Sequence, residues 1–594
     1  MNTNQKLRIG CASAFYGDSQ LAARQLVDYG AIDYLVFDYL AEVTMAILAN
    51  DKARDERLGF AVDFVNVAMK DVLADCARKG IKVIANAGGI NVPGCIEALE
   101  KLCESQSLDL KIAGVYGDDL LDRKSELAGK GMPELQSGEP LPENLLSMNA
   151  YLGAQPIVKA LAAGADVVVT GRVVDSAVVI APLVEAFGWA NDDYEKLSQA
   201  ALAGHIIECG AQCTGGNFTD WQLVPDFSNM SYPVVEVCVD GSFEVQIPPG
   251  TGGLVTTATV GEQLVYEIGD PANYLLPDVA CDWSGVELHT VGQNRVRVLG
   301  ARGRAPGNAY KVCAIHADGY KLMGSFFMAG PRSREKARTS LEAWVKRTQR
   351  YFNMQGWAGY RGVSLEMIGS EDTYGSHSRA HDTREVIGKF GLHHDSRDAL
   401  TFAANELAYL ATSATPGMSG LGGGRARPTP LMRVHSTLIN KDEVTVTVRL
   451  GNNVIEERYF AGDAESAVSE GQMYELSPAP TSNNIIEVPL ETLAWARSGD
   501  KGDNANIGVI ARKPEYLPYL YEQLTAEVVA DYFSHCVRGE VQRFDLPGIN
   551  GFNFFMTEAL GGGGAGSLQI DPQGKAFAQM LLSKVIILPE TMLE

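Results

Sequence analysis

The sequence predicts an α/β fold in two unequal domains: an N-terminal domain with a parallel β-sheet and an added mixed β layer, and a small C-terminal α+β domain. In the first 200 residues, short apolar runs alternate with helical patterns. From about residue 230 the pattern changes to short strands separated by turns. A polar stretch at 461–484, with prolines near its end, then precedes a block large enough for its own core.

Length and charge limit the classes of protein. A chain of 594 residues exceeds the usual domain size of about 50–250 residues, so we expect more than one domain. The net charge of −23 repels nucleic acid and anionic lipid, and neither is an expected partner. We find neither an apolar leader in the first residues nor an apolar run long enough for a membrane helix, so we expect a cytoplasmic location.

The N-terminal elements follow one another in a regular order. Apolar strands separated by helices are typical of a parallel sheet covered on both faces, either open or closed into a barrel. Helices are predicted at 21–30, to about residue 50, and from about residue 93. The expected strands are 7–14, 32–40, 81–89, 110–120 and 165–171.

Further elements are predicted as far as the C-terminus. Strands are expected at 234–247, 252–268, 295–304 and 444–451, and helices at 332–352 and 399–412, with a loop at 414–430. The last block is predicted as strands 487–497 and 506–512, helices around 515–534, strands around 540–556, a glycine loop at 561–566 and a helix at 573–585. The predicted divisions are therefore a domain at 1–460, which can subdivide near 230, a linker at 461–484 and a domain at 485–594.

Polar residues follow each of the first five predicted strands. Ligands of α/β sheets and barrels bind beyond the carboxyl ends of the strands, so this set predicts a site for acid and base chemistry. Helix capping by single Asp, Asn and Ser residues is the alternative. The residues include Asp18, Asp38, Glu42, Asn86, Asn91, Asp118, Arg172 and Asp175.

Two pairs of residues stand out as candidate catalytic groups. Arg172 follows a buried strand and can hold a carboxylate or phosphate, with Asp175 to orient it or to move a proton; a structural ion pair is the alternative. His205 and Glu208 have helical i, i+3 spacing and can act as an acid/base pair, or His205 can be a hydrogen-bonded core histidine.

Two glycine-rich segments of the last block are candidate anion-binding loops. In ARSGDKGDNANIG, glycines let backbone amides approach an anion, although a tight turn that binds its own Asp and Asn side chains is the alternative. The GGGGAGS segment can seat a phosphate or act as a lid. The predicted substrate-binding residues are Asn86, Asn91, Arg497, Asp500, Lys501, Asp503, Asn504, Asn506, Gly562, Gly563 and Gly564.

Metal and cofactor motifs are weak or missing. His377, His381 and Asp382 have a spacing that can bind zinc on a helix, but HExxH is absent and a solvated polar loop is expected instead. Cys209 and Cys213 near His205 are expected to be packing residues. Neither GxGxxG after a strand nor GxSxG occurs, so we predict no metal and no cofactor, except CoA as part of a substrate.

Several strings resemble the acyclic terpene utilisation (AtuA-type) family. They include NAYLGAQPIVKALAAGADVVVTGRVVDSAVVIAPL, HIIECGAQCTGGNF and, in the last block, LAWARSGDKGDNANIGVIAR. The resemblance implies a ferredoxin-like C-terminal domain. It also implies bacterial catabolism of citronellol or geraniol, beside acyl-CoA carboxylases, dehydrogenases and hydratases. The segment 366–400 departs from the family pattern, and no role is transferred to it.

The leading hypothesis is an enzyme that adds or removes water in a branched acyl-CoA or carboxylic acid, a hydro-lyase type of reaction. Arg172 would hold a carboxylate, and Asp175 or Asp118 would move protons with His205. The ARSGDKGDN segment would bind phosphates or close the site. The alternatives are a non-catalytic assembly subunit of an acyl-CoA carboxylase or hydratase system, and a metal-dependent hydrolase. A homo-oligomer is expected.

Overall fold

A parallel five-stranded sheet forms the centre of the N-terminal domain. The computed structural model describes residues 5–420, 424–457, 468–480 and 482–593. The parallel strands lie in the order β1, β2, β3, β6, β4. The strand order has two free ends, so the sheet is open and not a barrel. The bounds are β1 (Lys6–Cys11), β2 (Tyr34–Phe37), β3 (Lys82–Ala85), β4 (Ile112–Tyr116) and β6 (Val167–Thr170).

Antiparallel strands extend this sheet on both sides, to eleven strands in all. The hairpin predicted at 234–247 pairs with β1 and does not form a separate layer. These strands are β7 (Val234–Cys238), β8 (Phe243–Gln246), β11 (Glu287–Gly292) and β12 (Arg295–Leu299) at one edge, and β19 (Val446–Leu450) and β20 (Asn453–Glu457) at the other.

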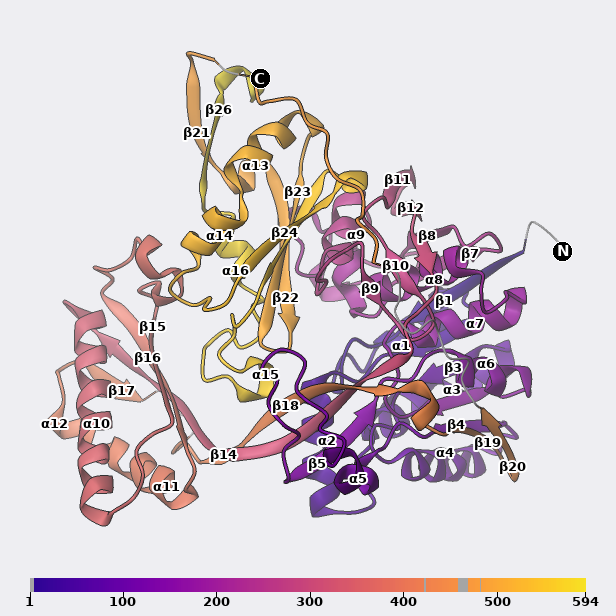
Figure 1. Cartoon of the computed structure of the whole chain (residues 1–594), viewed down its shortest axis with the longest axis horizontal. Helices are drawn as coiled ribbons and strands as arrows, with labels where there is room; N and C mark the ends of the chain where they lie inside the picture. Colours follow the sequence, from indigo (N-terminus) through magenta and orange to yellow (C-terminus); the bar gives the residue numbers. More distant parts are fainter. Residues whose placement is uncertain (1–4, 421–423, 458–467, 481, 594) are drawn as a thin grey trace.

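Helices cover both faces of the parallel strands (Figure 1), as their apolar sequences require. All four residues of β2 and of β6 are buried. Helix α7 is apolar around most of its circumference because it packs between α6 and α8. The helices are α1 (Ala22–Tyr29), α2 (Glu42–Arg54), α3 (Lys70–Lys79), α4 (Val92–Gln106), α5 (Lys124–Ala128), α6 (Gln155–Ala162), α7 (Ala177–Phe187) and α8 (Tyr194–Ile207).

A second, antiparallel sheet is organised around the long strand β14 (Ala309–Ala329). Its first half pairs with β5 (Leu145–Ala150) and β18 (Thr429–Asn440) beside the N-terminal domain. Its second half pairs with β16 (Glu385–His394) and β17 (Met418–Gly420), and β15 (Gly362–Ile368) pairs with β16. At about 3.3 Å per residue, a strand of this length carries the chain well away from the first sheet.

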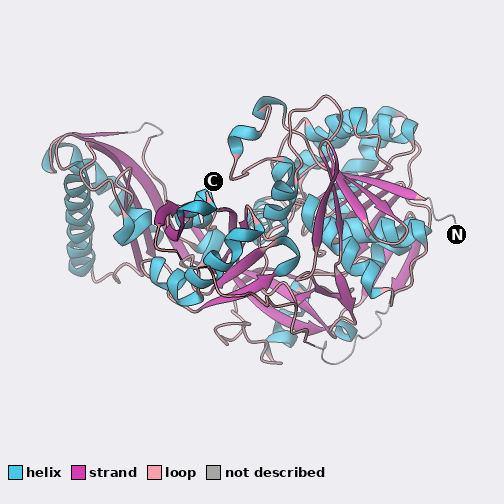
Figure 2. Cartoon of the chain, turned by 90° about the horizontal axis from the view of Figure 1, so that it is seen from above, coloured by secondary structure: helices cyan, strands magenta, loops and turns pink. Residues whose placement is uncertain are grey.

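The second half of β14 belongs to a projecting lobe, residues 320–420. Helices α10 (Ser333–Gln355) and α11 (Arg397–Glu406) pack on its sheet and enclose a hydrophobic cluster separate from the main core. Figures 1 and 2 both show this lobe at one end of the molecule.

The C-terminal domain is a four-stranded antiparallel sheet with helices and a core of its own. The strand order is β22 (Ala494–Lys501), β23 (Asn504–Ala511), β25 (Gly551–Met556), β24 (Val541–Leu546). A separate pair consists of β21 (Ile485–Pro489) and β26 (Val585–Pro589). The helices include α13 (Leu517–Gln523), α14 (Ala526–Tyr532) and α16 (Phe577–Leu581).

Four element predictions are wrong. The loop expected at 414–430 contains strand β17 and the first residues of β18, because both pair with β14. The stretch 252–268 contains helix α9 (Thr257–Leu264), whose capping box between Thr256 and Thr259 outweighs the strand preference of its Val and Thr residues. The ARSGDKGDNANIG segment is a β-hairpin, with only Gly502 and Asp503 between its strands, because cross-strand pairing absorbs most of its polar backbone. The helix expected at 573–585 shortens to α16, and strand β26 follows it.

The remaining small elements lie beside α8 and the predicted linker. Strands β9 (Tyr274–Leu275), β10 (Ala280–Asp282) and β13 (Arg302–Arg304) form a three-stranded sheet. Residues 468–480 have neither helix nor strand, and Ser469 donates a hydrogen bond to Asp282 at 2.8 Å. The linker residues 461–467 and 481 lie outside the described residues.

The C-terminal domain docks on the chain segment that follows α9. The Asn506 side chain donates to the Val265 carbonyl at 2.7 Å and accepts from the Glu267 amide at 3.0 Å. Asn553 donates to the Ile268 carbonyl at 2.9 Å. Gly508 lies directly against Val265, so a Cβ atom at this position would overlap the valine side chain. The contact therefore depends on a glycine and two buried amides.

Replacement of Gly508 by Ala should weaken this docking. The added methyl group overpacks the Val265 contact, and overpacking costs about 1–3 kcal/mol. We expect a lower urea midpoint, together with faster proteolysis near 485–511. Gly307→Ala is the matched control, because a Cβ atom there meets no neighbouring atom within 4 Å. Equal midpoints for the two variants would contradict the assigned contact.

Candidate active site between the parallel sheet and the C-terminal domain

Ionisable side chains gather where the carboxyl ends of β2 and β6 approach the β22–β23 hairpin. Some come from the C-terminal domain, and the others come from the rest of the chain, including α2, α8 and β14. Their charges shift one another's pKa values. We call this group the central polar cluster. Its members are Asp38, Glu42, Asn86, Tyr151, Arg172, Asp175, His205, Glu208, Tyr266, Glu267, Tyr274, Lys311, Asp500, Lys501 and Lys575.

Asp38 is a buried carboxyl group at the end of β2. Asn86 from the neighbouring strand end donates a hydrogen bond to its Oδ1, and the Asn86 oxygen accepts from the Tyr39 amide at 2.7 Å. Burial raises the pKa of Asp38, and the nearby carboxylates of Asp175 and Glu208 raise it further. Three carboxyl groups therefore compete for protons in one place.

Arg172 and Asp175 form an ion pair with unequal exposure. The guanidinium stacks on the Tyr151 ring at 3.9 Å, and its Nη1 donates to Asp175 Oδ1 at 2.6 Å. The Arg172 side chain is 3% exposed and that of Asp175 is 36% exposed. Burial raises the pKa of Asp175, with Arg172 and Lys501 opposing the rise. Arg172 thus orients Asp175, which is the member of the pair that solvent reaches.

Glu42 anchors a second ion pair beside Tyr151. The Tyr151 hydroxyl donates to Glu42 Oε1 at 2.8 Å, and Lys311 of β14 donates to the same oxygen at 3.0 Å. Although burial opposes it, the positive charges of Lys311 and Arg172 lower the pKa of Glu42. Glu42 therefore stays ionised while Asp38 and Asp175 gain affinity for protons.

His205 is buried between two hydrogen-bond acceptors. Its Nε2 lies 3.2 Å from the Leu264 carbonyl and its Nδ1 lies 3.1 Å from Glu208 Oε1. A carbonyl only accepts, so Nε2 must carry a hydrogen, and the contact with Glu208 needs a second one. The two contacts fix the orientation of the His205 ring next to Glu208.

The C-terminal domain supplies the remaining charges. Lys575 donates to Glu267 Oε1 at 2.8 Å and to Asp500 Oδ1 at 3.3 Å, and it also donates to the Tyr266 hydroxyl. Burial and the charge of Glu267 raise the pKa of Asp500 to about 7. The Lys501 ammonium lies 5.7 Å from the centre of the Tyr274 ring. Asp500 is close enough to Glu42, and Lys501 to Asp175, for their charges to interact, so both hairpin residues face the strand ends of the other domain.

Sequence reasoning missed several members of the cluster as site residues. Asp38 and Glu42 belong to the strand-end set of the sequence analysis, but not to its candidate catalytic pairs. Neither a regular spacing nor a motif marks the others, because they come from unrelated parts of the chain. These are Tyr151, Tyr266, Glu267, Tyr274, Lys311 and Lys575.

Three predicted site residues make the contacts of structural groups. Asp18 accepts from the Ala14 and Ser19 amides at 2.9 and 2.7 Å and thereby holds its loop. Asn91 caps α4 by accepting from the Gly94 amide at 3.1 Å. Asp118 accepts from the Arg172 amide at 2.8 Å and from Asn149 at 2.9 Å. Asp118 therefore supports the backbone of Arg172 from outside the cluster.

The glycine loop at 561–566 binds the hairpin turn of its own domain. The Asp503 carboxylate accepts from the Gly562 amide at 2.7 Å and from the Leu560 amide at 3.2 Å. The Asn504 side chain accepts from the Glu558 amide. Gly563 lies against the Gly502 carbonyl and Gly564 against Val43 of α2. These two glycines therefore allow close approach, and an internal carboxylate already occupies the Gly562 amide.

Arg497 also has a protein partner. Its guanidinium donates to the Gln212 side chain and to the Asn217 carbonyl, and it lies 4.8 Å from the Tyr266 ring. Of the predicted hairpin residues, Asp500 and Lys501 join the central polar cluster. Arg497, Asp503, Asn504 and Asn506 hold the hairpin in its position.

The histidine-rich segment is divided between different surroundings. His377 stacks on Tyr532 at 4.1 Å, whereas His393 and His394 are buried in β16 beside backbone carbonyls. Among the described residues, no group of three or more His, Cys, Asp or Glu side chains could hold a metal ion. Burial raises the pKa of the Cys209 and Cys213 thiols.

An open α/β sheet that meets a ferredoxin-like domain across a polar cluster defines a two-domain α/β protein. The chain belongs to the acyclic terpene utilisation family, because residues 7–450 match "Acyclic terpene utilisation family protein AtuA". Residues 488–587 match the AtuA ferredoxin-like domain. The family implies a role in acyclic terpene utilisation. Searches of curated proteins and of solved structures gave no match.

In the described ranges, no helix combines the length and the apolar character that a membrane span needs.

Asp118 should make stability depend on pH. Burial raises its pKa from 3.8 to about 6, so the folded state holds the ionised carboxylate at a cost above pH 6. Relative to Asp118→Asn, the wild-type free energy of unfolding should fall by about 2 kcal/mol between pH 4 and pH 7. Urea unfolding at both pH values measures the difference. Exposed Asp122→Asn is the control, and a gap that does not change with pH would contradict the assignment.

Proposed function

We propose that the chain is an enzyme that moves protons on a branched acyl-CoA or carboxylic acid, by addition or loss of water next to the carbonyl group. The observation that carries the proposal is the pair of carboxyl groups with raised pKa, Asp175 and Asp500, that face each other's domains beside Lys501. Carboxyl groups tuned toward neutrality are typical of general acids and bases. The family role in terpene utilisation supports the substrate class.

Asp175 is the proposed general base. Its side chain is partly open to solvent, and Arg172 holds it through a short ion pair. Burial and the nearby charge of Glu208 favour proton uptake by Asp175. Because the Arg172 side chain is almost fully buried, we assign it the orientation of Asp175 and not the capture of a substrate carboxylate.

Lys501 is the proposed anchor for the substrate's negative oxygen. Within the part of the chain that the structure describes, its ammonium group has no hydrogen bond or ion pair, whereas Lys575 is paired with Glu267 at 2.8 Å. An unpaired ammonium can stabilise the oxyanion that develops at a carbonyl group when the adjacent carbon loses its proton. The Lys501 charge already lowers the pKa of Asp175 and of Glu267.

The two carboxyl groups provide the two proton transfers that dehydration needs. Asp175 removes the proton from the carbon next to the carbonyl group. Protonated Asp500 gives its proton to the leaving hydroxyl group, which departs as water as the carbon–carbon double bond forms. Hydration is the reverse, so the same two groups exchange roles.

Asp175→Asn and Lys501→Ala should separate chemistry from binding. In a thermal-shift and mass-spectrometric screen against CoA, short and branched acyl-CoAs and their free acids, we expect one ester or acid to bind and turn over. Asp175→Asn should lower kcat by about 10²–10⁴-fold, since it removes the base. Lys501→Ala should reduce kcat/KM and binding. Asp122→Asn and Lys346→Ala are exposed control substitutions.

If no compound of the panel binds or turns over, the proposed enzyme function is rejected. This result would favour the assembly subunit, which pull-down with acyl-CoA carboxylase or hydratase subunits would then test. If both Asp175→Asn and Lys501→Ala retain wild-type turnover, the proposed site is rejected, but the proposed class of reaction is not.

The pH profile should report Asp500. Because Asp500 must be protonated to act as the acid, kcat/KM for dehydration should fall as pH rises through about 7. Asp500→Asn should lower kcat/KM strongly, and the residual kcat/KM of this variant should not fall as pH rises through about 7. Initial rates measured across the neutral range check this. A limb with the same midpoint in the variant would assign the ionisation to another group.

A further inference from the structure

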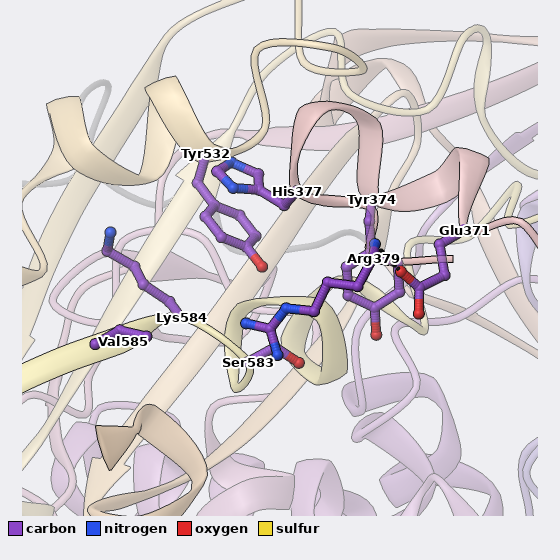
Figure 3. Close-up of a pocket in the computed structure, with 8 residues that line it drawn as sticks. All are labelled: Glu371, Tyr374, His377, Arg379, Tyr532, Ser583, Lys584 and Val585. Atoms are coloured by element: carbon purple, nitrogen blue, oxygen red, sulfur yellow. Dashed lines mark hydrogen bonds between the residues drawn. The ribbon is translucent and has the colours of Figure 1, made fainter. Parts of the chain in front are cut away.

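A cavity lies between the projecting lobe and the C-terminal domain, in contacts that the proposed function does not use. Its volume is about 370 Å³, within the range of about 300–1,000 Å³ typical of small-molecule sites. The segment 371–379 forms one wall, and α14 with the start of β26 forms the other (Figure 3). The lining residues are Glu371, Tyr374, His377, Arg379, Tyr532, Ser583, Lys584 and Val585.

Two cations of this cavity have no hydrogen bond or ion pair for their charged groups among the described residues. In the described ranges, neither the Arg379 guanidinium nor the Lys584 ammonium forms a hydrogen bond or an ion pair with another side chain. One Glu371 oxygen is engaged by the Arg379 amide at 2.6 Å. In a chain with 73 acidic and 50 basic residues, two unpaired cations around one cavity indicate an anionic ligand.

Aromatic rings line the same space. His377 and Tyr532 stack at 4.1 Å with nearly parallel planes, and Tyr374 lies beside them. The Lys584 ammonium is 5.9 Å from the Tyr532 ring centre. The Tyr532 hydroxyl donates to the Met580 carbonyl at 2.8 Å, so the Tyr532 ring is the part of this side chain that a ligand can contact.

We propose that this cavity binds a nucleoside phosphate, with the base against the His377 and Tyr532 rings and the phosphate between Arg379 and Lys584. A guanidinium binds phosphate through two parallel hydrogen bonds, and an aromatic surface accepts a planar base. The ligand can be a free nucleotide or the nucleotide part of a larger molecule such as CoA. This inference does not depend on the reaction at the central polar cluster.

Isothermal titration calorimetry on the full chain tests the site with four probes: AMP, CoA, adenosine and inorganic phosphate. We expect AMP or CoA to bind at least about 10-fold more tightly than adenosine and phosphate, since base and phosphate contribute together. If AMP binds as tightly as CoA, a free nucleotide is sufficient for binding at this site. If CoA binds more tightly than AMP, the ligand is the larger molecule that contains the nucleotide.

Arg379→Ala and Lys584→Ala should each weaken the binding of the favoured probe about 10-fold or more. Lys346→Ala and Arg350→Ala on α10 are matched exposed controls that should bind as the wild type does. Arg379→Lys should retain part of the affinity, which separates lost charge from lost folding. Thermal melts identify any variant that fails to fold.

Three results would overturn the site. These are no binding of any probe, equal binding of AMP and adenosine, and unchanged affinity in both Arg379→Ala and Lys584→Ala. Lys501→Ala locates the ligand: lost affinity there would place the nucleotide in the central polar cluster and reject the cavity, whereas unchanged affinity supports it. Failure at the cavity leaves the turnover experiments on Asp175 unaffected.

Discussion

The close contact between strand β23 and the segment after α9 holds the rest of the site in place. Gly508 leaves room for Val265, and the Asn506 and Asn553 side chains bind the backbone around Glu267. The hairpin turn is only two residues long, so the position of β23 fixes Asp500 and Lys501 as well. Without this contact, the strand ends of the parallel sheet would face solvent with an excess of carboxylates.

The cluster joins opposite charges from different parts of the chain. Asp38 and Asp175 lie on the sheet side next to Glu208, where burial and the charge of Glu208 raise the pKa of both aspartates. Glu42 keeps its charge because Lys311, carried by β14, binds it. Burying a carboxylate without a cation beside it would cost several kcal/mol of folding free energy, so the cluster needs its lysine and arginine side chains. The same conditions produce groups that can exchange protons near neutral pH.

Part of the fold followed from local patterns. The five apolar strands and their helices had the periodicity of a parallel sheet, and Gly80 ends α3 in the left-handed conformation that favours glycine. The prediction failed for α9, where capping side chains outweighed Val and Thr. It failed again for the β22–β23 hairpin, whose glycine and charged residues resemble a loop until their backbone pairs across strands.

The sequence alone determined the family, the α/β class, and the strand ends that carry Asp38, Asn86, Arg172 and Asp175. These depend on local periodicity and on motifs, both of which are readable along one chain. Tertiary structure alone decided that Asp18, Asn91 and Asp118 make structural contacts. It also decided that Lys311 binds Glu42 and that Lys575 binds Glu267 within the central polar cluster. The physical reason is that burial and charge coupling depend on distance in space, and residues 175, 311 and 501 meet only when three separate sheets pack together.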